Sequence, residues 1–357
     1  MSVIAAVHGQ LAPHRYPQAE ITAAFAEVVS PTGEHRPLIE RIHLATGIEF
    51  RNLAIPLDEY AQLSGFGEAN DAFIRVALDL GEAAINGALQ EVGLDARDID
   101  LVMSTSVTGI ATPSLDAQLV ARVGFREDIK RLPIFGLGCV AGAAGIARIH
   151  DYLLGHPHDI ALLLSVELCS LTVQRDDYSM PNIVASGLFG DGAAAVIMVG
   201  ADRAKELGLT GPRVLASRSR LYPRTERTMG WDISERGFRV VLSAGVGDVI
   251  SQYLREDVDA FLTSQGRALG DVTRWVCHPG GPRVLQAIES SLELDASQLD
   301  VTWRSLAAIG NLSSASVLHV LRDTMHGCGM EQPPSRTPGV VMAMGPGFCA
   351  ELVLLEW

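Results

Sequence analysis

The stretch Gly136-Leu-Gly-Cys-Val-Ala-Gly-Ala-Ala-Gly145 sets a cysteine between a predicted strand over 130–137 and a predicted helix over 140–154. A thiol at the start of a helix lies near unpaired N–H groups and the positive end of the helix dipole, and both favour the thiolate. The glycines allow a sharp turn and leave room for an incoming carbonyl. Because its residues are small, the helix can pack closely, so we expect it at the centre of the fold. Cys139 is therefore the candidate nucleophile.

Two other polar residues occupy distinctive turns. His278 begins His278-Pro-Gly-Gly-Pro282 after a predicted strand over 274–277, and Asn311 lies in Gly310-Asn-Leu-Ser-Ser314. An imidazole at the carboxyl end of a strand could take the thiol proton and later donate a hydrogen bond to a thioester oxygen. An amide NH₂ group could donate to an oxyanion without carrying charge. The alternatives are a core histidine bonded to the backbone and, for Asn311, a helix N-cap.

The composition indicates a large, acidic protein with free thiols. The 357 residues are 48% hydrophobic and carry a formal net charge of -14, which favours an extensive core and argues against a nucleic-acid partner. The longest aliphatic run, 160–166, is too short to span a bilayer, so no stable membrane insertion is expected. Five cysteines without paired spacing and an N-terminus unlike a signal peptide predict a reduced, cytoplasmic protein. No metal site is predicted, and four cysteines are interpreted as small buried hydrophobes: Cys169, Cys277, Cys328 and Cys349.

Strands and helices alternate along the whole chain, which predicts an α/β fold. Polar and turn residues over 205–212 mark a soft boundary. Gly190-Asp-Gly192 and Gly345-Pro-Gly347 each precede an apolar strand late in their half, which indicates a duplicated unit. We therefore divide the chain into halves 1–212, with the cysteine, and 213–357, with the histidine and asparagine. The predicted helices include 71–92, 116–123, 140–154, 246–264, 283–292 and 314–326.

The ordered cysteine, histidine and asparagine turns resemble those of the thiolase-like condensing enzymes, and more narrowly those of the chalcone synthase-like type III polyketide synthases. Within that family, the chain is similar to mycobacterial enzymes that make long-chain alkylpyrones. The resemblance implies a duplicated, layered αβαβα fold of the thiolase type. It also implies coenzyme A thioesters as substrates without a further cofactor, and a homodimer in which Thr112-Pro113 helps to wall the partner's cavity. The stretches that carry the likeness are Val166-Glu-Leu-Cys-Ser-Leu-Thr172, Leu188-Phe-Gly-Asp-Gly-Ala193, His278-Pro-Gly-Gly-Pro282, Thr302-Trp-Arg-Ser305 and Gly345-Pro-Gly347.

The resemblance also implies a role for each site residue. Cys139 would carry the acyl group, and His278 and Asn311 would hold the thioester carbonyl and favour malonyl decarboxylation. Phe189 matches a gatekeeping phenylalanine between the coenzyme A tunnel and the cavity, and Val240 falls where plant members place a second one. Arg51 is the candidate for gripping coenzyme A phosphates. The remaining residues expected to bind substrate are Cys169, which replaces a threonine, Thr172, Ser313 and Thr108.

We therefore predict an enzyme that condenses a medium- to long-chain fatty acyl-CoA starter with malonyl-CoA or methylmalonyl-CoA and releases an alkyl α-pyrone. Small residues near the nucleophile and Val240 would leave room for an apolar tail. One alternative is a ketoacyl-carrier-protein synthase of the type that starts fatty acid synthesis. Another is a type III synthase that gives resorcinol or other aromatic products. A thiol hydrolase and a non-catalytic binding protein fit the three turns less well.

Overall fold

The computed structural model describes residues 1–30, 32–175, 177–327 and 336–357, so Cys328 lies outside the described residues. Its central element is a nine-stranded sheet in the order β11-β12-β13-β8-β1-β7-β6-β4-β5. The N-terminal strands are β1 (Ser2–Leu11), β4 (Leu101–Thr105), β5 (Lys130–Ile134), β6 (Ile160–Leu168) and β7 (Asp191–Gly200). The C-terminal strands are β8 (Arg213–Leu221), β11 (Arg274–Cys277), β12 (Pro338–Gly345) and β13 (Cys349–Glu356).

The two parts of the sheet repeat one pairing pattern. In the first part, β1 pairs antiparallel with β7, β7 antiparallel with β6, and β6 parallel with β4. In the second part, β8, β13, β12 and β11 pair in the same sequence of directions. The predicted correspondence between Gly190-Asp-Gly192 and Gly345-Pro-Gly347 fits this repeat, because these turns lead into the equivalent strands β7 and β13. The duplicated α/β fold is thus confirmed, while the domain boundary at 212/213 stays a prediction.

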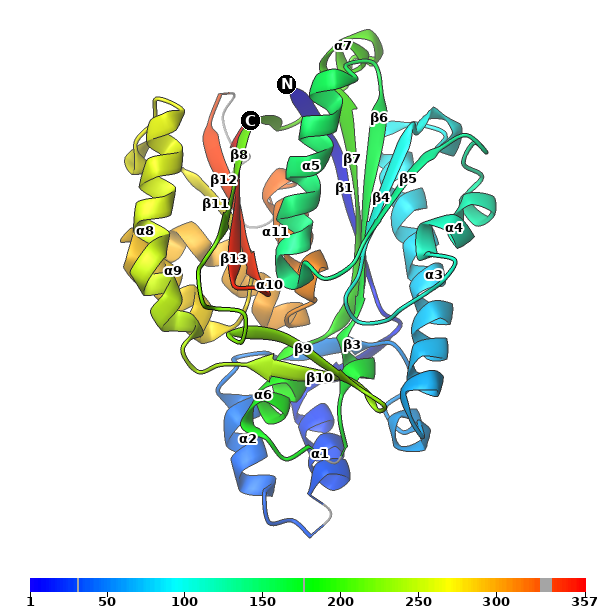
Figure 1. The fold of residues 1–357 in the computed structure, drawn as a ribbon, viewed down its shortest axis with the longest axis vertical. Coiled ribbons are helices and arrows are strands. Elements are labelled where there is room, and N and C mark those ends of the chain that lie inside the picture. Colours follow the sequence, from blue (N-terminus) through cyan, green and yellow to red (C-terminus); the bar gives the residue numbers. More distant parts are fainter. Residues whose placement is uncertain (31, 176, 328–335) are drawn as a thin grey trace.

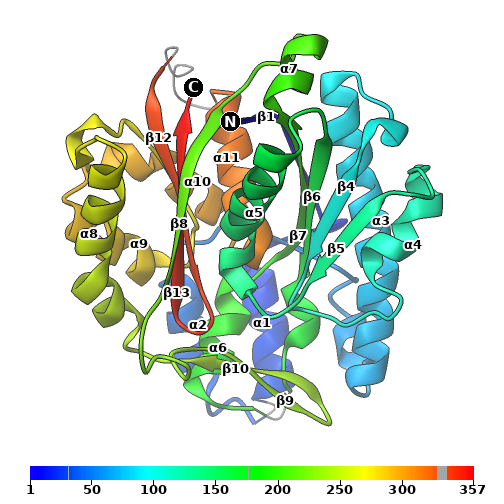
Figure 2. The same ribbon diagram turned by 45° about the horizontal axis from the view of Figure 1, so that its top comes forward.

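Helices fill three layers around the two parts of the sheet (Figure 1). Between them lie α5 (Ala141–Gly155) and α11 (Ser316–Met325), whose apolar residues share one buried core with both parts. The outer face of the first part packs against α3 (Phe66–Val92) and α4 (Leu115–Val123), and that of the second against α8 (Val246–Ser264) and α9 (Pro282–Leu292). The result is the expected αβαβα arrangement, and Figure 2 shows it with the top turned forward.

One end of the layers is covered by shorter elements, which lie at the bottom of Figure 1. They surround the ends of the strands that carry the predicted site residues. They include α1 (Gln18–Val29), α2 (Arg36–Leu44), β2 (His14–Pro17), β3 (Phe50–Leu53), α6 (Met180–Leu188), and the hairpin β9 (Met229–Ser234) and β10 (Gly237–Leu242). Helix α10 (Asp300–Ile309) lies higher in the picture and packs against β3. The remaining helix, α7 (Ala201–Leu207), lies at the opposite end. Among the described residues, no helix is both long and apolar enough to cross a membrane.

The small residues of α5 explain why the two parts of the fold can approach so closely. A Cβ atom added to Gly142 would lie 2.3 Å from the backbone carbonyl of Ser314 and 2.7 Å from Val317. One added to Gly145 would lie 2.5 Å from Leu163 on β6. Real Cβ contacts are essentially never this short. Gly142 therefore requires glycine, because backbone is in the way, whereas at Gly145 the Leu163 side chain would have to move.

We expect Gly142→Ala to lower the free energy of unfolding by about 1–3 kcal/mol, because a backbone carbonyl cannot move aside as a flexible side chain can. The matched control is Gly155→Ala on the same helix, where an added Cβ meets nothing within 4 Å. That change should stay within about 0.5 kcal/mol of the parent. Urea denaturation measures both, and equal midpoints for the two variants would contradict the proposed close contact.

Candidate active site

Cys139 lies in a single 3₁₀ turn, Gly138–Val140, that leads directly into α5. Gly138 has a φ of +60°, and a Cβ there would lie 2.5 Å from the ring of Pro346. A Cβ on Gly345 would lie 2.8 Å from the carbonyl of Leu137 and from the N–H of Val140. The Gly345-Pro-Gly347 turn therefore packs directly against the cysteine turn and holds the thiol in position.

The two polar atoms of the Asn311 side chain bind different turns. Its Oδ1 atom accepts the backbone N–H of Ser313 at 2.8 Å, in the turn before α11. Because a backbone N–H can only donate, this bond fixes the amide orientation and turns the NH₂ group the other way. Nδ2 then donates to the carbonyl of Gly280, in the turn that follows His278, at 3.3 Å. The side chain thus joins the Asn311 and His278 turns.

Ser313 links this pair to the nucleophile. Its Oγ atom lies 3.4 Å from the Sγ atom of Cys139. Its φ of +49° falls in the left-handed region, which is unfavourable for a residue with a side chain. The N–H bond to Asn311 helps to hold this conformation. A continuous chain of contacts therefore runs from Cys139 through Ser313 and Asn311 to Gly280, and the structure brings the three predicted turns together from both halves of the sequence.

Burial sets the charge state of the two ionisable groups at this site. Desolvation raises the pKa of Cys139 to about 12, although the hydrogen bond from Ser313 acts in the opposite direction. Desolvation lowers the pKa of His278 to about 3. The loss of hydration thus opposes the effect expected of the helix start. Burial favours a neutral thiol and a neutral imidazole in the absence of substrate.

His278 is held mainly through its backbone. It follows β11, and its N–H donates to the carbonyl of Met342 on β12 at 2.8 Å. Within the described part of the chain, the buried Nδ1 atom has no hydrogen-bond partner. The alternative of a core histidine tied to the backbone through its ring is not supported at this atom. The imidazole therefore keeps hydrogen-bonding capacity for a substrate.

Phe189 directly adjoins the Asn311 turn. Asn311 donates its N–H to the carbonyl of Leu188 at 2.9 Å and accepts that of Gly190 at 2.9 Å. The carbonyl of Phe189 accepts Nη1 of Arg51 at 2.7 Å, and Nε of Arg51 donates to Gln18 at 2.8 Å. Arg51 is only 2% exposed, and burial lowers its pKa to about 10. The predicted role of Arg51 in gripping phosphates therefore does not fit, because this guanidinium braces the Phe189 turn in the interior.

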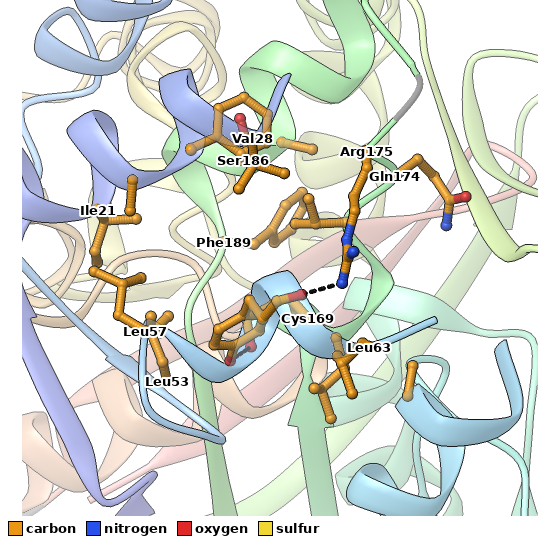
Figure 3. A pocket seen from close by; sticks show the side chains of 18 of the residues that line it. Ile21, Val28, Leu53, Leu57, Leu63, Cys169, Gln174, Arg175, Ser186 and Phe189 are labelled. Carbon is orange, nitrogen blue, oxygen red and sulfur yellow. Dashed lines mark hydrogen bonds between the residues drawn. The ribbon is translucent and has the colours of Figure 1, made fainter. Parts of the chain in front are cut away.

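Phe189, Cys169 and Arg51 line a cavity of about 430 Å³ (Figure 3). Much of its remaining wall is apolar and comes from α1, from Leu53 and Leu57, and from Leu171 and Val173. Four other predicted substrate-binding residues are not part of this lining in the described structure. Thr172 donates to the carbonyl of Cys169 at 2.7 Å, and Val240 lies on β10, which packs against α6. Ser313 contacts Cys139, and Thr108 donates a hydrogen bond to Glu167.

Glu167 is a site residue that our sequence reasoning missed. It is fully buried and accepts the hydroxyl of Thr108 at 2.9 Å, the N–H of Val107 at 3.1 Å and the hydroxyl of Ser314. Burial raises the pKa of this carboxyl. The negative charge of Glu167 also raises the pKa of Cys139, so the two groups interact electrostatically. A glutamate inside the otherwise apolar strand β6 was the available signal.

The loop expected to contact a partner subunit lies beside the edge of the sheet. The Thr112-Pro113 peptide is cis, and the neighbouring β5 is an edge strand. Three apolar side chains near this edge are substantially exposed, namely Ile110, Leu132 and Phe135. The homodimer stays a prediction. No group of three or more potential metal-ligating side chains occurs among the described residues.

The pKa of Cys139 leads to a test of its resting state. Alkylation of Cys139 by iodoacetamide should accelerate continuously from pH 6 to pH 9, because the reactive thiolate becomes more abundant at each step. Peptide mass spectrometry separates Cys139 from the other cysteines, and Cys139→Ser supplies the background. A rate that levels off below pH 8 would instead reveal a thiolate–imidazolium pair in the free enzyme.

Comparisons with known proteins agree with this geometry. Residues 59–203 match the family model for the N-terminal domain of chalcone and stilbene synthases, and residues 213–356 match the one for the C-terminal domain. The chain is 54% identical to a 1,3,6,8-tetrahydroxynaphthalene synthase of Streptomyces peucetius subsp. caesius, over 99% of this chain and 93% of that protein. It is 34% identical to a putative chalcone synthase of Bacillus subtilis (strain 168), over 87% and 86% of the two chains.

Solved structures give the same answer. The crystal structure of 1,3,6,8-tetrahydroxynaphthalene synthase from Streptomyces coelicolor A3(2), a bacterial type III polyketide synthase, superimposes with a TM-score of 0.92 at 30% identity. The match covers 99% of each chain. The chain therefore belongs to the chalcone and stilbene synthase family and is a type III polyketide synthase, a decarboxylating, condensing acyltransferase.

Proposed function

We propose that this enzyme makes an aromatic polyketide of the tetrahydroxynaphthalene class from malonyl-CoA. The observation that carries the proposal is the 54% identity, over 99% of the chain, to a protein named for that product. Other similar proteins, at about half that identity, are named phloroglucinol synthase and 3,5-dihydroxyphenylacetyl-CoA synthase. The products in these names are also aromatic. This favours the aromatic alternative over the alkylpyrone, and the narrower likeness to mycobacterial alkylpyrone synthases stays a prediction.

The linked turns support a specific division of labour. The Cys139 thiol adds to a thioester carbonyl, its proton passes to the neutral imidazole of His278, and coenzyme A leaves with that proton. Loss of CO₂ from a malonyl thioester gives an enolate, whose oxygen accepts hydrogen bonds from Asn311 and His278. The enolate carbon then attacks the acyl carbonyl on Cys139 and releases the sulfur. Repetition lengthens the chain before the ring closes.

A second candidate activity uses a fatty acyl-CoA starter and ends in an α-pyrone. The cavity beside Cys169 and Phe189 favours it, because much of the wall is aliphatic or aromatic. Its volume of about 430 Å³ would admit a chain of several methylene groups. Each buried methylene contributes about 0.8 kcal/mol, so longer starters would bind more tightly until the cavity is full.

One experiment separates the two activities. The enzyme is given malonyl-CoA alone, or malonyl-CoA with starters from acetyl-CoA to stearoyl-CoA, and products are identified by mass spectrometry. We expect an aromatic product from malonyl-CoA alone, at a kcat/KM above that with any added starter. A marked preference for long acyl-CoA starters, with pyrones as products, would establish the second candidate. No CO₂ release under any condition would contradict both.

Asn311 gives a test of the decarboxylation step. Asn311→Ala should slow CO₂ release from malonyl-CoA by about 100–1,000-fold, because a preorganised donor to the enolate oxygen is lost. Acylation of Cys139, and of no other cysteine, should persist in the mass spectrum.

The matched control is Asn311→Asp, which keeps an oxygen to accept the Ser313 N–H but has no NH₂ group. Equal losses in both variants would show that the NH₂ group is required and that the oxygen accepting the Ser313 N–H is not sufficient. Near-normal CO₂ release by the Asp variant would show that Asn311 acts only as a cap.

A further inference from the structure

One wall of the cavity is formed by a short segment between β3 and α3. We call residues 56–65 the cavity strap. Leu57, Tyr60, Leu63, Ser64 and Gly65 of the strap line the cavity, and its 3₁₀ turn Glu59–Gln62 has no buried residue. Tyr60 and Leu63 are partly buried and pack against the core of the first part of the sheet. A small set of polar contacts adds to this packing and fixes where the strap lies.

The inner contact runs from Tyr60 to a buried carboxylate. The hydroxyl of Tyr60 is hydrogen-bonded to that of Ser170, which donates in turn to Asp191. Asp191 also accepts the N–H of Ala54 at 2.6 Å and that of Ser170 at 2.8 Å. Since Asp191 already binds two backbone donors, the Tyr60 ring is tied to a fixed point of β7. Ser170 adjoins Cys169, so the ring is held beside the part of the cavity that Cys169 lines.

The outer contact comes from Arg175. Its guanidinium donates to the backbone carbonyl of Ala61 at 2.8 Å and to that of Tyr60, and its side chain lies at the cavity in Figure 3. Two further hydrogen bonds hold the strap ends. The hydroxyl of Tyr16 accepts the N–H of Leu57 at 3.2 Å, and Glu68 accepts that of Ser64 at 2.7 Å. Tyr60 is thus the residue held both through its side chain and through its backbone.

We infer that Tyr60 and Arg175 are specificity-determining residues, which fix the depth of this cavity and so the length of the acyl or polyketide chain that the enzyme accommodates. The inference rests on the proposed function, in which Cys139 carries that chain. The pinned ring occupies space that a longer chain needs, and the aliphatic residues Leu57 and Leu63 of the strap line the same cavity. Removing the ring deepens the cavity, whereas removing Arg175 lets the strap move.

The first test measures binding without turnover. In a Cys139→Ala background, calorimetry gives the affinities of hexanoyl-CoA and lauroyl-CoA, and the ratio between them is the readout. Tyr60→Ala should raise the preference for lauroyl-CoA at least tenfold, because each newly buried methylene adds roughly fourfold. Arg175→Ala should shift the ratio in the same direction by a smaller factor. The control Leu154→Ala, on the exposed end of α5, should leave it unchanged.

Tyr60→Phe separates volume from anchoring. It keeps the ring and removes the bond to Ser170, so its ratio should move less than that of Tyr60→Ala. An unchanged ratio in Tyr60→Ala, with circular dichroism like that of the parent, would overturn the inference. Because this readout needs no catalysis, it stays decisive even if malonyl-CoA gives no aromatic product. In the active enzyme, the longest chain released should also increase in Tyr60→Ala.

Discussion

The close approach of α5 to the Asn311 turn is the constraint on which the rest of the site depends. The backbone at Gly142 would meet the Ser314 carbonyl if it carried any side chain. This contact sets Ser313 beside the sulfur of Cys139, and Ser313 in turn is held by Asn311. The reacting groups are therefore positioned by backbone packing between two central helices, and the polar contacts refine an arrangement that the packing has already imposed.

Burial then gives this site its electrostatic character. A thiol and an imidazole that are both kept neutral avoid the cost of an isolated buried charge. Glu167, close to both the nucleophile turn and Ser314, adds to that preference because it disfavours a neighbouring anion. The carbonyl oxygen of a bound thioester can take up negative charge, because Asn311 and His278 can both donate hydrogen bonds to it. Charge separation is thereby coupled to the presence of substrate.

The sequence predicted the layers and the three key turns because these depend on local patterns. Helix α8 and strand β11 have the bounds that periodicity indicated, 246–264 and 274–277. The pattern did not predict α6, whose amphipathic stretch is short and begins beside a proline. The strap was also missed, since no local periodicity marks an irregular segment that lines a cavity.

Arg51 and Cys139 show why chemistry was harder to predict than position. An arginine near an expected phosphate site is usually at the surface, and only the tertiary structure reveals that this one is enclosed by Gln18 and Phe189. The helix start at Cys139 is a local signal for a thiolate, whereas its desolvation depends on residues from both halves of the chain. Properties that sum over distant neighbours cannot be obtained from spacing alone.

The repeated sheet also restricts which substitutions this protein can accept during evolution. Cys139 belongs to the first repeat, and His278 and Asn311 belong to the second. Over the part of the chain that the structure describes, the two parts of the sheet pair with each other only at Ser2–Val214 and Val3–Arg213. Neither repeat by itself contains a complete reacting centre. A substitution on α5 is therefore acceptable only if the opposite repeat still fits against it. Selection acts on the two repeats as a matched pair, and a segment exchanged with a relative should preserve function best when both facing surfaces are transferred together.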